Sequence, residues 1–228
     1  MDGLLVLFDI DGTLLDTGGA GMAALKEASK ELYGVEGPEL DLAGSTDSGI
    51  VRQLFGAMEI EWSEERAIVF YERYLVRLEA NMQDGSFAGR VFPGVEALLD
   101  RLHAAEATIG LLTGNIAGGA ALKTRHYGLG RYFRFGAYGD DHHDRNELGP
   151  IALSRAEAVT GRRFAGSEAI VIGDTPKDIA CGRAMGARTL CVATGTFTAG
   201  ELRDHGADVV VEDFSDTAEV LAELQPGS

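Results

Sequence analysis

Hydrophobic residues recur along the chain in short runs that are typical of buried β-strands. These runs occupy residues 4–9, 108–113, 135–138, 169–174, 188–193 and 208–211. Most of them are apolar almost without alternation, which indicates strands buried on both faces of a parallel sheet. Between the runs lie patterns typical of helices, at residues 95–104, 117–127, 151–160, 176–185 and 217–224. This alternation predicts an α/β fold with a doubly wound, Rossmann-like parallel sheet.

One interval interrupts the alternation. From residue 16 to residue 92 we find no convincing strand, only amphipathic helical stretches around 22–33, 48–58 and 63–82. The interval is too long to connect a strand to a helix and too regularly patterned to be a loop. We therefore predict an α-helical cap domain at residues 16–89, inserted into a core formed by residues 1–15 and 90–228. The expected hinges are residues 16–19 and 89–94.

Charge limits the partners that this chain can have. The 228 residues include 20 lysines and arginines against 36 aspartates and glutamates, which gives a formal net charge of −16. A surface this negative repels nucleic acid and acidic membranes, so we expect neither as a partner. It also means that an anionic substrate must be held by a local concentration of positive charge.

Apolar segments and cysteines predict a cytoplasmic protein. No apolar run approaches the roughly 18 residues that span a bilayer. The run at residues 4–8 is short and has no preceding basic region, unlike a signal peptide. Cys181 and Cys191 form no CxxC motif and lie in apolar surroundings, so we expect buried free thiols in a reducing compartment. The pattern gives no indication of an oligomeric state.

Two carboxylates follow the first predicted strand. Asp9 and Asp11 are two positions apart on an extended chain, so their side chains point the same way at the end where open α/β sheets bind ligands. Gly12 permits a sharp turn, and Thr13 offers a hydroxyl group and a backbone N–H. Carboxylates this close repel one another unless a cation or a shared proton relieves them. A calcium-binding EF-hand is the competing interpretation, but it requires further ligands and flanking helices.

The strand at residues 108–113 ends in Thr113-Gly114-Asn115, immediately before a predicted helix. A hydroxyl group and the unpaired N–H groups of a new helix form an anion-binding site. Asn115 can also be a plain helix N-cap.

A second pair of carboxylates follows the strand at residues 169–174. Asp174 ends this apolar run, Pro176 occupies the favoured first position of a helix, and Asp178 lies in the first helical turn. Oxygen-rich, incomplete sites of this kind bind Mg²⁺. Alternatively, Asp178 stabilises the helix by compensating its dipole.

The polar loop at residues 140–146 contains two histidines and one arginine. His142 and His143 lack further ligands at the spacing of a zinc site, so we expect a solvated loop and no zinc. Arg145 places a fixed positive charge just before the helix that we expect to open near Gly149 and Pro150.

In their order and placement, these four segments resemble the signature motifs of the haloacid dehalogenase-like hydrolase superfamily over the whole chain. The insertion resembles the cap of its phosphoglycolate phosphatase and β-phosphoglucomutase branch. The resemblance implies that Asp9 is the nucleophile and Asp11 the general acid and base, with Thr113 binding phosphate. It also implies that Asp174 and Asp178 form the acidic pair of a Mg²⁺ site, to which Asp9 and the backbone carbonyl of Asp11 contribute.

One position departs from the pattern of the superfamily. A lysine usually neutralises the phosphate, whereas Arg145 occupies that place here. Lys123 and Lys177 are weaker alternatives for this role. We also expect substrate contacts from Thr13, Gly114 and Asn115, the polar groups around the phosphate.

The resemblance implies a Mg²⁺-dependent phosphatase that acts on a small phosphorylated metabolite through an aspartyl-phosphate. The main alternative is a phosphomutase of the β-phosphoglucomutase type. A haloacid dehalogenase is disfavoured because resembling enzymes lack the second aspartate. A non-catalytic phosphate-binding protein is disfavoured because nothing catalytic is missing.

The segment at residues 43–48 of the predicted cap is the best candidate to face the substrate, through Ser45 and Thr46. The same residues form a good helix N-cap cluster, which is the alternative interpretation. Phosphoglycolate, sugar phosphates and nucleotides all remain open as substrates.

Overall fold

The fold is built around one six-stranded parallel sheet. A computed structural model describes residues 3–38 and 43–225 of the chain. The strand order is β5-β4-β1-β6-β7-β8, and every neighbouring pair is parallel. The strands are β1 (Leu5–Phe8), β4 (Thr108–Leu112), β5 (Gly136–Ala137), β6 (Ala169–Gly173), β7 (Arg188–Val192) and β8 (Val209–Val211). The predicted α/β class and all six predicted strands are confirmed.

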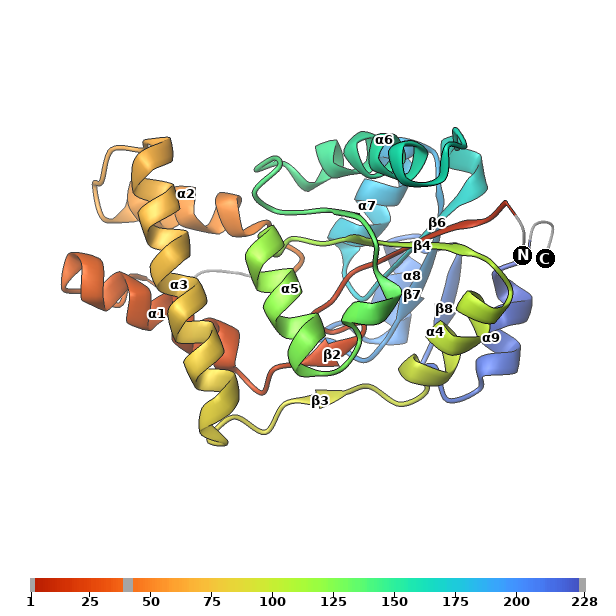
Figure 1. Ribbon diagram of the computed structural model, residues 1–228, viewed down its shortest axis with the longest axis horizontal. Helices are drawn as coiled ribbons and strands as arrows, with labels where there is room; N and C mark the ends of the chain where they lie inside the picture. The colour runs from red at the N-terminus through yellow and green to blue at the C-terminus, as the bar shows by residue number, and fades with distance from the viewer. Residues whose placement is uncertain (1–2, 39–42, 226–228) are drawn as a thin grey trace.

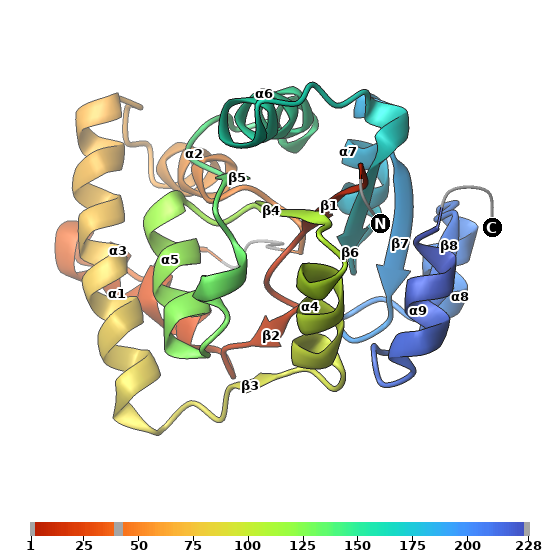
Figure 2. The same cartoon turned by 45° about the vertical axis from the view of Figure 1, so that its right-hand side comes forward.

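Helices cover both faces of this sheet (Figures 1 and 2). One face carries α4 (Val95–Ala104), α5 (Ala117–His126) and α9 (Thr217–Glu223). The other carries α6 (Leu148–Thr160), α7 (Pro176–Met185) and α8 (Ala199–Asp204). Val6 and Phe8 pack on the first face, whereas Leu5 and Leu7 pack on the second. Because both faces of β1 are buried, its sequence shows no polar alternation.

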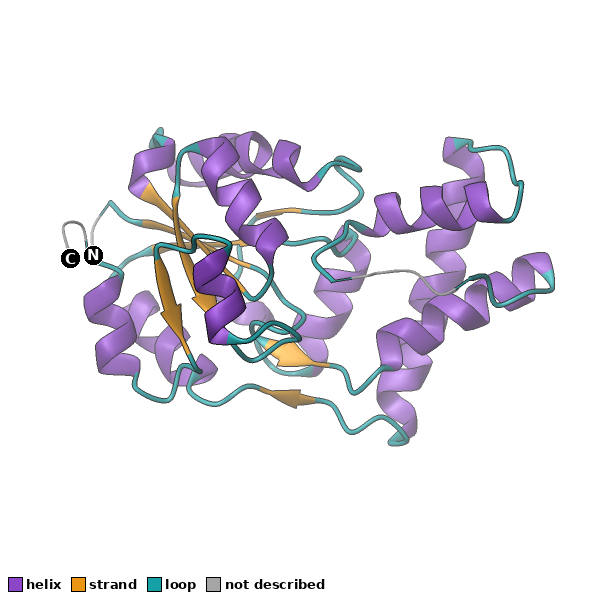
Figure 3. Cartoon of the chain, turned by 180° about the vertical axis from the view of Figure 1, so that it is seen from behind, coloured by secondary structure: helices purple, strands orange, loops and turns teal. Residues whose placement is uncertain are grey.

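Three helices lie between β2 and β3, as the sequence pattern predicts. They are α1 (Ala20–Tyr33), α2 (Asp47–Ala57) and α3 (Glu64–Asp84), which Figures 1 and 3 show grouped at one end of the molecule. They share an apolar cluster that includes Ala24, Phe55 and Phe70. Ile116, at the start of α5, belongs to the same cluster, so these helices also pack against a helix of the sheet layer.

A two-residue antiparallel ribbon joins the two connections to these helices. β2 (Leu15–Asp16) pairs with β3 (Arg90–Val91). These residues fall largely in the interval where the sequence indicates no strand, because two residues are too few to show a period. Gly18 beside the ribbon has a φ of 64°, and a Cβ there would lie 2.8 Å from the backbone of Ala88. A glycine is therefore required for the two connections to meet closely.

The order of the strands fixes where a ligand can bind. The chain leaves β1, adds β4 and β5 on one side, and then returns to place β6 on the other side of β1. The carboxyl ends of β1, β4 and β6 therefore lie next to one another at a topological switch point. In the part of the chain that the structure describes, no helix is long and apolar enough to cross a membrane.

Candidate active site

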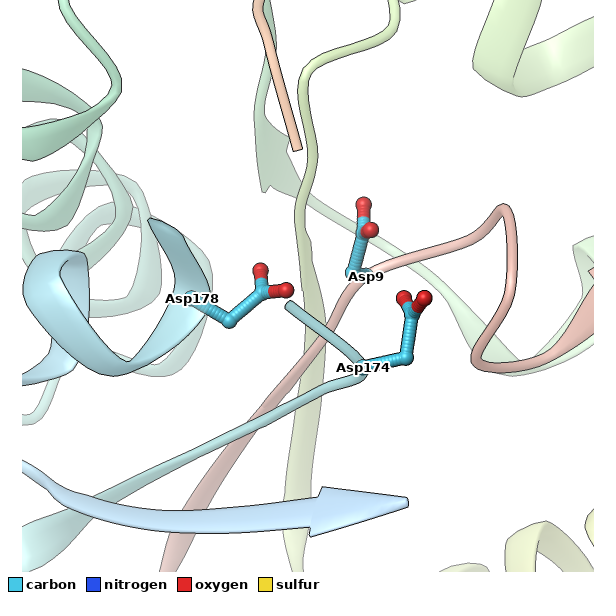
Figure 4. A group of neighbouring side chains, drawn as sticks. All are labelled: Asp9, Asp174 and Asp178. Atoms are coloured by element: carbon cyan, nitrogen blue, oxygen red, sulfur yellow. The ribbon is translucent and has the colours of Figure 1, made fainter. Parts of the chain in front are cut away.

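Three buried carboxylates meet at this switch point (Figure 4). Asp9 directly follows β1, Asp174 directly follows β6, and Asp178 lies in the first turn of α7. Each offers a ligand oxygen, and these atoms all lie within 4.8 Å of one another. Among the described residues this is the only such group of potential metal ligands, and it contains neither His142 nor His143.

The carboxylates have the chemistry of a site for a hard cation. Oδ1 of Asp9 is buried and has no hydrogen-bond partner within the described residues. Burial is the main cause that raises the pKa of Asp9 to about 6, and Arg145 opposes it most strongly. Burial, followed by the charges of Asp178 and Asp9, raises the pKa of Asp174 well above its usual range. A divalent cation with oxygen ligands, such as Mg²⁺, would relieve both effects.

Arg145 is buried beside these carboxylates, at the start of the 3₁₀ turn Arg145–Glu147. Its Nη2 lies 3.2 Å from Oδ1 of Asp9 and also contacts Oδ1 of Asp178. Its Nη1 donates a hydrogen bond of 3.1 Å to the carbonyl oxygen of Gly44. One guanidinium group therefore links the end of β1, the start of α7 and the loop before α2.

Both oxygens of Asp178 are engaged within the protein. Oδ1 faces Arg145, and Oδ2 accepts hydrogen bonds from the amide (3.0 Å) and hydroxyl (2.7 Å) of Thr175, the N-cap of α7. Asp174 differs: among the described residues its Oδ1 accepts one hydrogen bond, of 3.0 Å, from the hydroxyl of Thr13. Asp174 is therefore the better placed of the two to contact a metal ion, while Asp178 fixes Arg145 and the helix start.

Asp11 lies apart from the buried carboxylates and is paired with Lys123. The Nζ of Lys123, on α5, lies 2.8 Å from Oδ1 and 2.6 Å from Oδ2 of Asp11. It donates a third hydrogen bond, of 2.6 Å, to Oδ1 of Asn115. The sequence alone assigns no such role to Lys123. The available signal is its place in a helix among the buried residues Gly119, Ala120 and Thr124.

The segment after β4 is held by its own side chains. Thr113 is fully buried, and its hydroxyl group lowers the pKa of the Asp9 carboxyl. Asn115 donates to Oδ2 of Asp11 (2.8 Å) and to the hydroxyl of Thr113 (2.9 Å). Asn115 is therefore not the N-cap of α5, a position that Ile116 occupies.

The expectation of unpaired helix amides at the start of α5 is wrong for two of them. The amide of Ile116 donates to Oδ2 of Asp47 (2.8 Å), and the amide of Ala117 donates to Oδ1 of Asp140 (2.9 Å). These carboxylates come from other parts of the chain and satisfy donors that a phosphate would otherwise use. Gly114 still lines the cavity described below.

The loop before α2 crosses the site, but its two residues that are predicted to contact substrate have different roles. Ser45 lines the cavity and accepts a hydrogen bond of 2.6 Å from Nζ of Lys177. Thr46 is the N-cap of α2: its hydroxyl accepts from Gly49 (3.1 Å) and donates to the carbonyl of His143 (2.6 Å). Its side chain is thus used for capping, the alternative interpretation of this segment.

A cavity of about 450 Å³ lies between the carboxylates and the three inserted helices. Its floor includes Asp9, Asp11 and Asp174, and it is also lined by Met22, Leu25, Ile50 and Tyr74 from the inserted helices. Gly114 permits the close approach of the two parts, because a Cβ there would lie 2.0 Å from the carbonyl oxygen of Ser45.

Comparisons with known proteins agree with this arrangement. The family model of the haloacid dehalogenase-like hydrolases matches residues 6–192. A phosphoglycolate phosphatase of Agrobacterium fabrum is 28% identical over 222 residues, covering 96% of this chain and 92% of that protein.

Solved structures share the fold. CbbY from Rhodobacter sphaeroides, crystallised in complex with phosphate, has a TM-score of 0.73 at 19% identity and covers 93% of this chain and 95% of its own. The β-phosphoglucomutase of Clostridium difficile has a TM-score of 0.73 at 17% identity, covering 98% of this chain and 97% of its own.

Proposed function

We propose that this chain, which belongs to the haloacid dehalogenase-like hydrolases, is a phosphatase that hydrolyses a small phosphomonoester. The reaction proceeds through an aspartyl-phosphate on Asp9. The observation that carries the proposal is the meeting of Asp9, Asp174 and Arg145 at the floor of one cavity. A full-length relative named as a phosphatase supports hydrolysis as the reaction. A phosphomutase remains the weaker alternative.

The residues suited to hold Mg²⁺ are Asp9, Asp174 and the backbone carbonyl of Asp11. When bound, Mg²⁺ supplies the positive charge that offsets the repulsion between a phosphate dianion and the carboxylate of Asp9. Arg145 and the hydroxyl of Thr113 are placed beside Asp9 to bind the equatorial phosphate oxygens, where charge spreads in the transition state. Asp178 keeps Arg145 in place.

The covalent step is a displacement at phosphorus. The carboxylate of Asp9 forms a bond to phosphorus as the bond to the leaving alkoxide breaks, and Asp11 donates a proton to that oxygen. Asp11 then removes a proton from a water molecule that attacks the phosphorus of the aspartyl-phosphate. Phosphate leaves, and the carboxylate of Asp9 is restored.

The surroundings of the Asp11 side chain differ from those that the sequence suggests. The sequence predicts that the side chain of Asp11 points the same way as that of Asp9, with a cation or a shared proton to relieve their repulsion. In the structure the Asp11 side chain is 44% exposed and contacts the ammonium of Lys123. We propose that Asp11 acts as general acid and base from this exposed position beside Lys123. We also place the protein in a reducing cytoplasm, because Cys181 and Cys191 are buried free thiols.

Turnover of p-nitrophenyl phosphate tests the proposal. Exhaustive EDTA treatment should abolish turnover, and added Mg²⁺ should restore it. Ca²⁺ should replace Mg²⁺ poorly, because its looser geometry misplaces the attacking carboxylate. Asp9→Asn should lower kcat by at least about 10³-fold, because an amide cannot accept the phosphoryl group.

The exposed Asp204, at the end of α8, offers a matched control. Asp204→Asn should retain wild-type turnover. Activity of Asp9→Asn within tenfold of wild type would exclude the covalent mechanism. Full turnover after removal of all divalent metal would exclude the assigned cofactor.

A further inference from the structure

We propose that the substrate carries a single anionic group, its phosphate, and that the alcohol released from it is uncharged and in part apolar. This inference rests on the proposed phosphatase function and specifies the substrate class of the same site. It follows from the charges and side chains of the cavity wall.

The cavity has little positive charge for a second anionic group. Among the lining residues that the structure describes, the only basic ones are Lys123 and Arg145. Against them stand five aspartates: Asp9, Asp11, Asp16, Asp47 and Asp174. A substrate carboxylate would therefore meet net repulsion in this cavity.

Both cations are already committed. The ammonium of Lys123 has three N–H donors, and it makes three contacts, with Oδ1 and Oδ2 of Asp11 and with Oδ1 of Asn115. Lys123 is only 4% exposed, which leaves little room for a further partner. The Nη atoms of Arg145 face Asp9, Asp178 and the carbonyl of Gly44, at the place where the phosphate binds.

The three inserted helices contribute four apolar or aromatic side chains to the cavity wall. Met22 and Leu25 come from α1, Ile50 from α2 and Tyr74 from α3. Met22 is 40% exposed, so part of its side chain is open to a ligand in the cavity. An apolar part of an alcohol gains by leaving water for this wall, whereas a carboxylate placed there loses its hydration without gaining a partner.

A matched pair of esters tests this inference. Butyl phosphate and 4-phosphooxybutanoate have the same chain length and differ in a terminal methyl or carboxylate group. With saturating Mg²⁺, kcat/KM should be at least about tenfold higher for butyl phosphate. Met22→Lys should lower the ratio of kcat/KM for butyl phosphate to kcat/KM for 4-phosphooxybutanoate by at least about fivefold, because it adds an unpaired cation at an exposed cavity position. Leu25→Lys should act in the same direction from the next turn of α1.

Val76→Lys is the matched control. Val76 lies on α3, is 58% exposed and does not line the cavity, so the variant changes the net charge equally but should leave the ratio unchanged. Turnover of both esters with preference for the carboxylate would overturn the inference and leave the phosphatase function intact. The inference is also overturned, with the phosphatase function intact, if Val76→Lys lowers the ratio of the two kcat/KM values as much as Met22→Lys does. If the protein hydrolyses neither of the two esters and also fails to hydrolyse p-nitrophenyl phosphate, the proposed function is overturned, and the inference with it.

Discussion

Substitution of Arg145 separates two contributions of one guanidinium group. Nη2 faces the carboxylates of Asp9 and Asp178, and Nη1 donates to the carbonyl of Gly44. A lysine ammonium can occupy only one of these two positions. Arg145→Lys should therefore keep the carboxylate contacts and lose the hydrogen bond to Gly44, which lowers the free energy of unfolding by about 1–2 kcal/mol.

Arg145→Ala removes the buried cation altogether. The carboxylates of Asp9 and Asp178 then lack a compensating charge, which should lower the free energy of unfolding by about 3–5 kcal/mol at pH 7.5 in EDTA. The loss should be smaller at pH 5, because burial raises the pKa of Asp9 to about 6 and its carboxyl is then largely neutral. For p-nitrophenyl phosphate, kcat/KM should fall at least about 100-fold, and Arg145→Lys should recover part of it.

Urea unfolding monitored by circular dichroism and initial rates with Mg²⁺ measure these two effects. Arg155→Ala is the control, because Arg155 makes a comparable paired contact with Asp141, at 2.5 and 2.7 Å, and does not line the cavity. It should leave kcat/KM unchanged. Near-normal kinetics of Arg145→Ala, combined with a severe loss in Lys123→Ala or Lys177→Ala, would show that the phosphate-neutralising cation is misassigned.

Two further substitutions test other parts of the site. Asp11→Asn should lower turnover of an alkyl phosphate by about 10²–10⁴-fold and that of p-nitrophenyl phosphate much less, because p-nitrophenolate scarcely needs an acid; equal losses in initial-rate assays would contradict the role of Asp11. Burial raises the pKa of Asp47 to about 6. Its carboxyl group therefore contributes most to the free energy of unfolding below pH 4, and this contribution falls by about 3 kcal/mol as the pH rises through 6. Asp47→Asn, whose amide oxygen can still accept from Ile116, should be more stable than wild type at pH 7.5 but not at pH 4 in urea unfolding, and an equal difference at both pH values would refute this.

The sheet could be predicted from the sequence because its signal is local. Continuous apolar runs such as β1 are apolar because helices cover both of their faces. The short elements could not be predicted in this way. The ribbon of β2 and β3 has two residues on each side, and α8 has six, too few to show a hydrophobic period. A capping box of Thr198 and Glu201 was the available signal for α8.

The carboxylates of the site could be placed for the same local reason. Asp9 and Asp174 each end an apolar strand, and the carboxyl ends of adjacent parallel strands meet. The pairing of Lys123 with Asp11 could not be predicted, because it joins residues 112 positions apart and depends on how α5 packs against the sheet. The same holds for Asp47, the first residue of α2, and for Asp140, in the turn after β5, which accept hydrogen bonds from the amides of Ile116 and Ala117 at the start of α5.

The distribution of charge supports the proposal that a divalent cation binds before the substrate. Asp9, Asp11, Asp174 and Asp178 face two side-chain cations, with Arg145 beside Asp9 and Asp178 and Lys123 beside Asp11. When all are ionised, two negative charges remain uncompensated, and they fall nearest to Asp9 and Asp174. A divalent cation held by these carboxylates would cancel the excess, and a phosphate dianion would then meet no net repulsion from them. Arg145 also donates a hydrogen bond to the carbonyl of Gly44, so the cation that we propose for phosphate binding is joined to the loop before α2, whose residues Gly44 and Ser45 line the cavity.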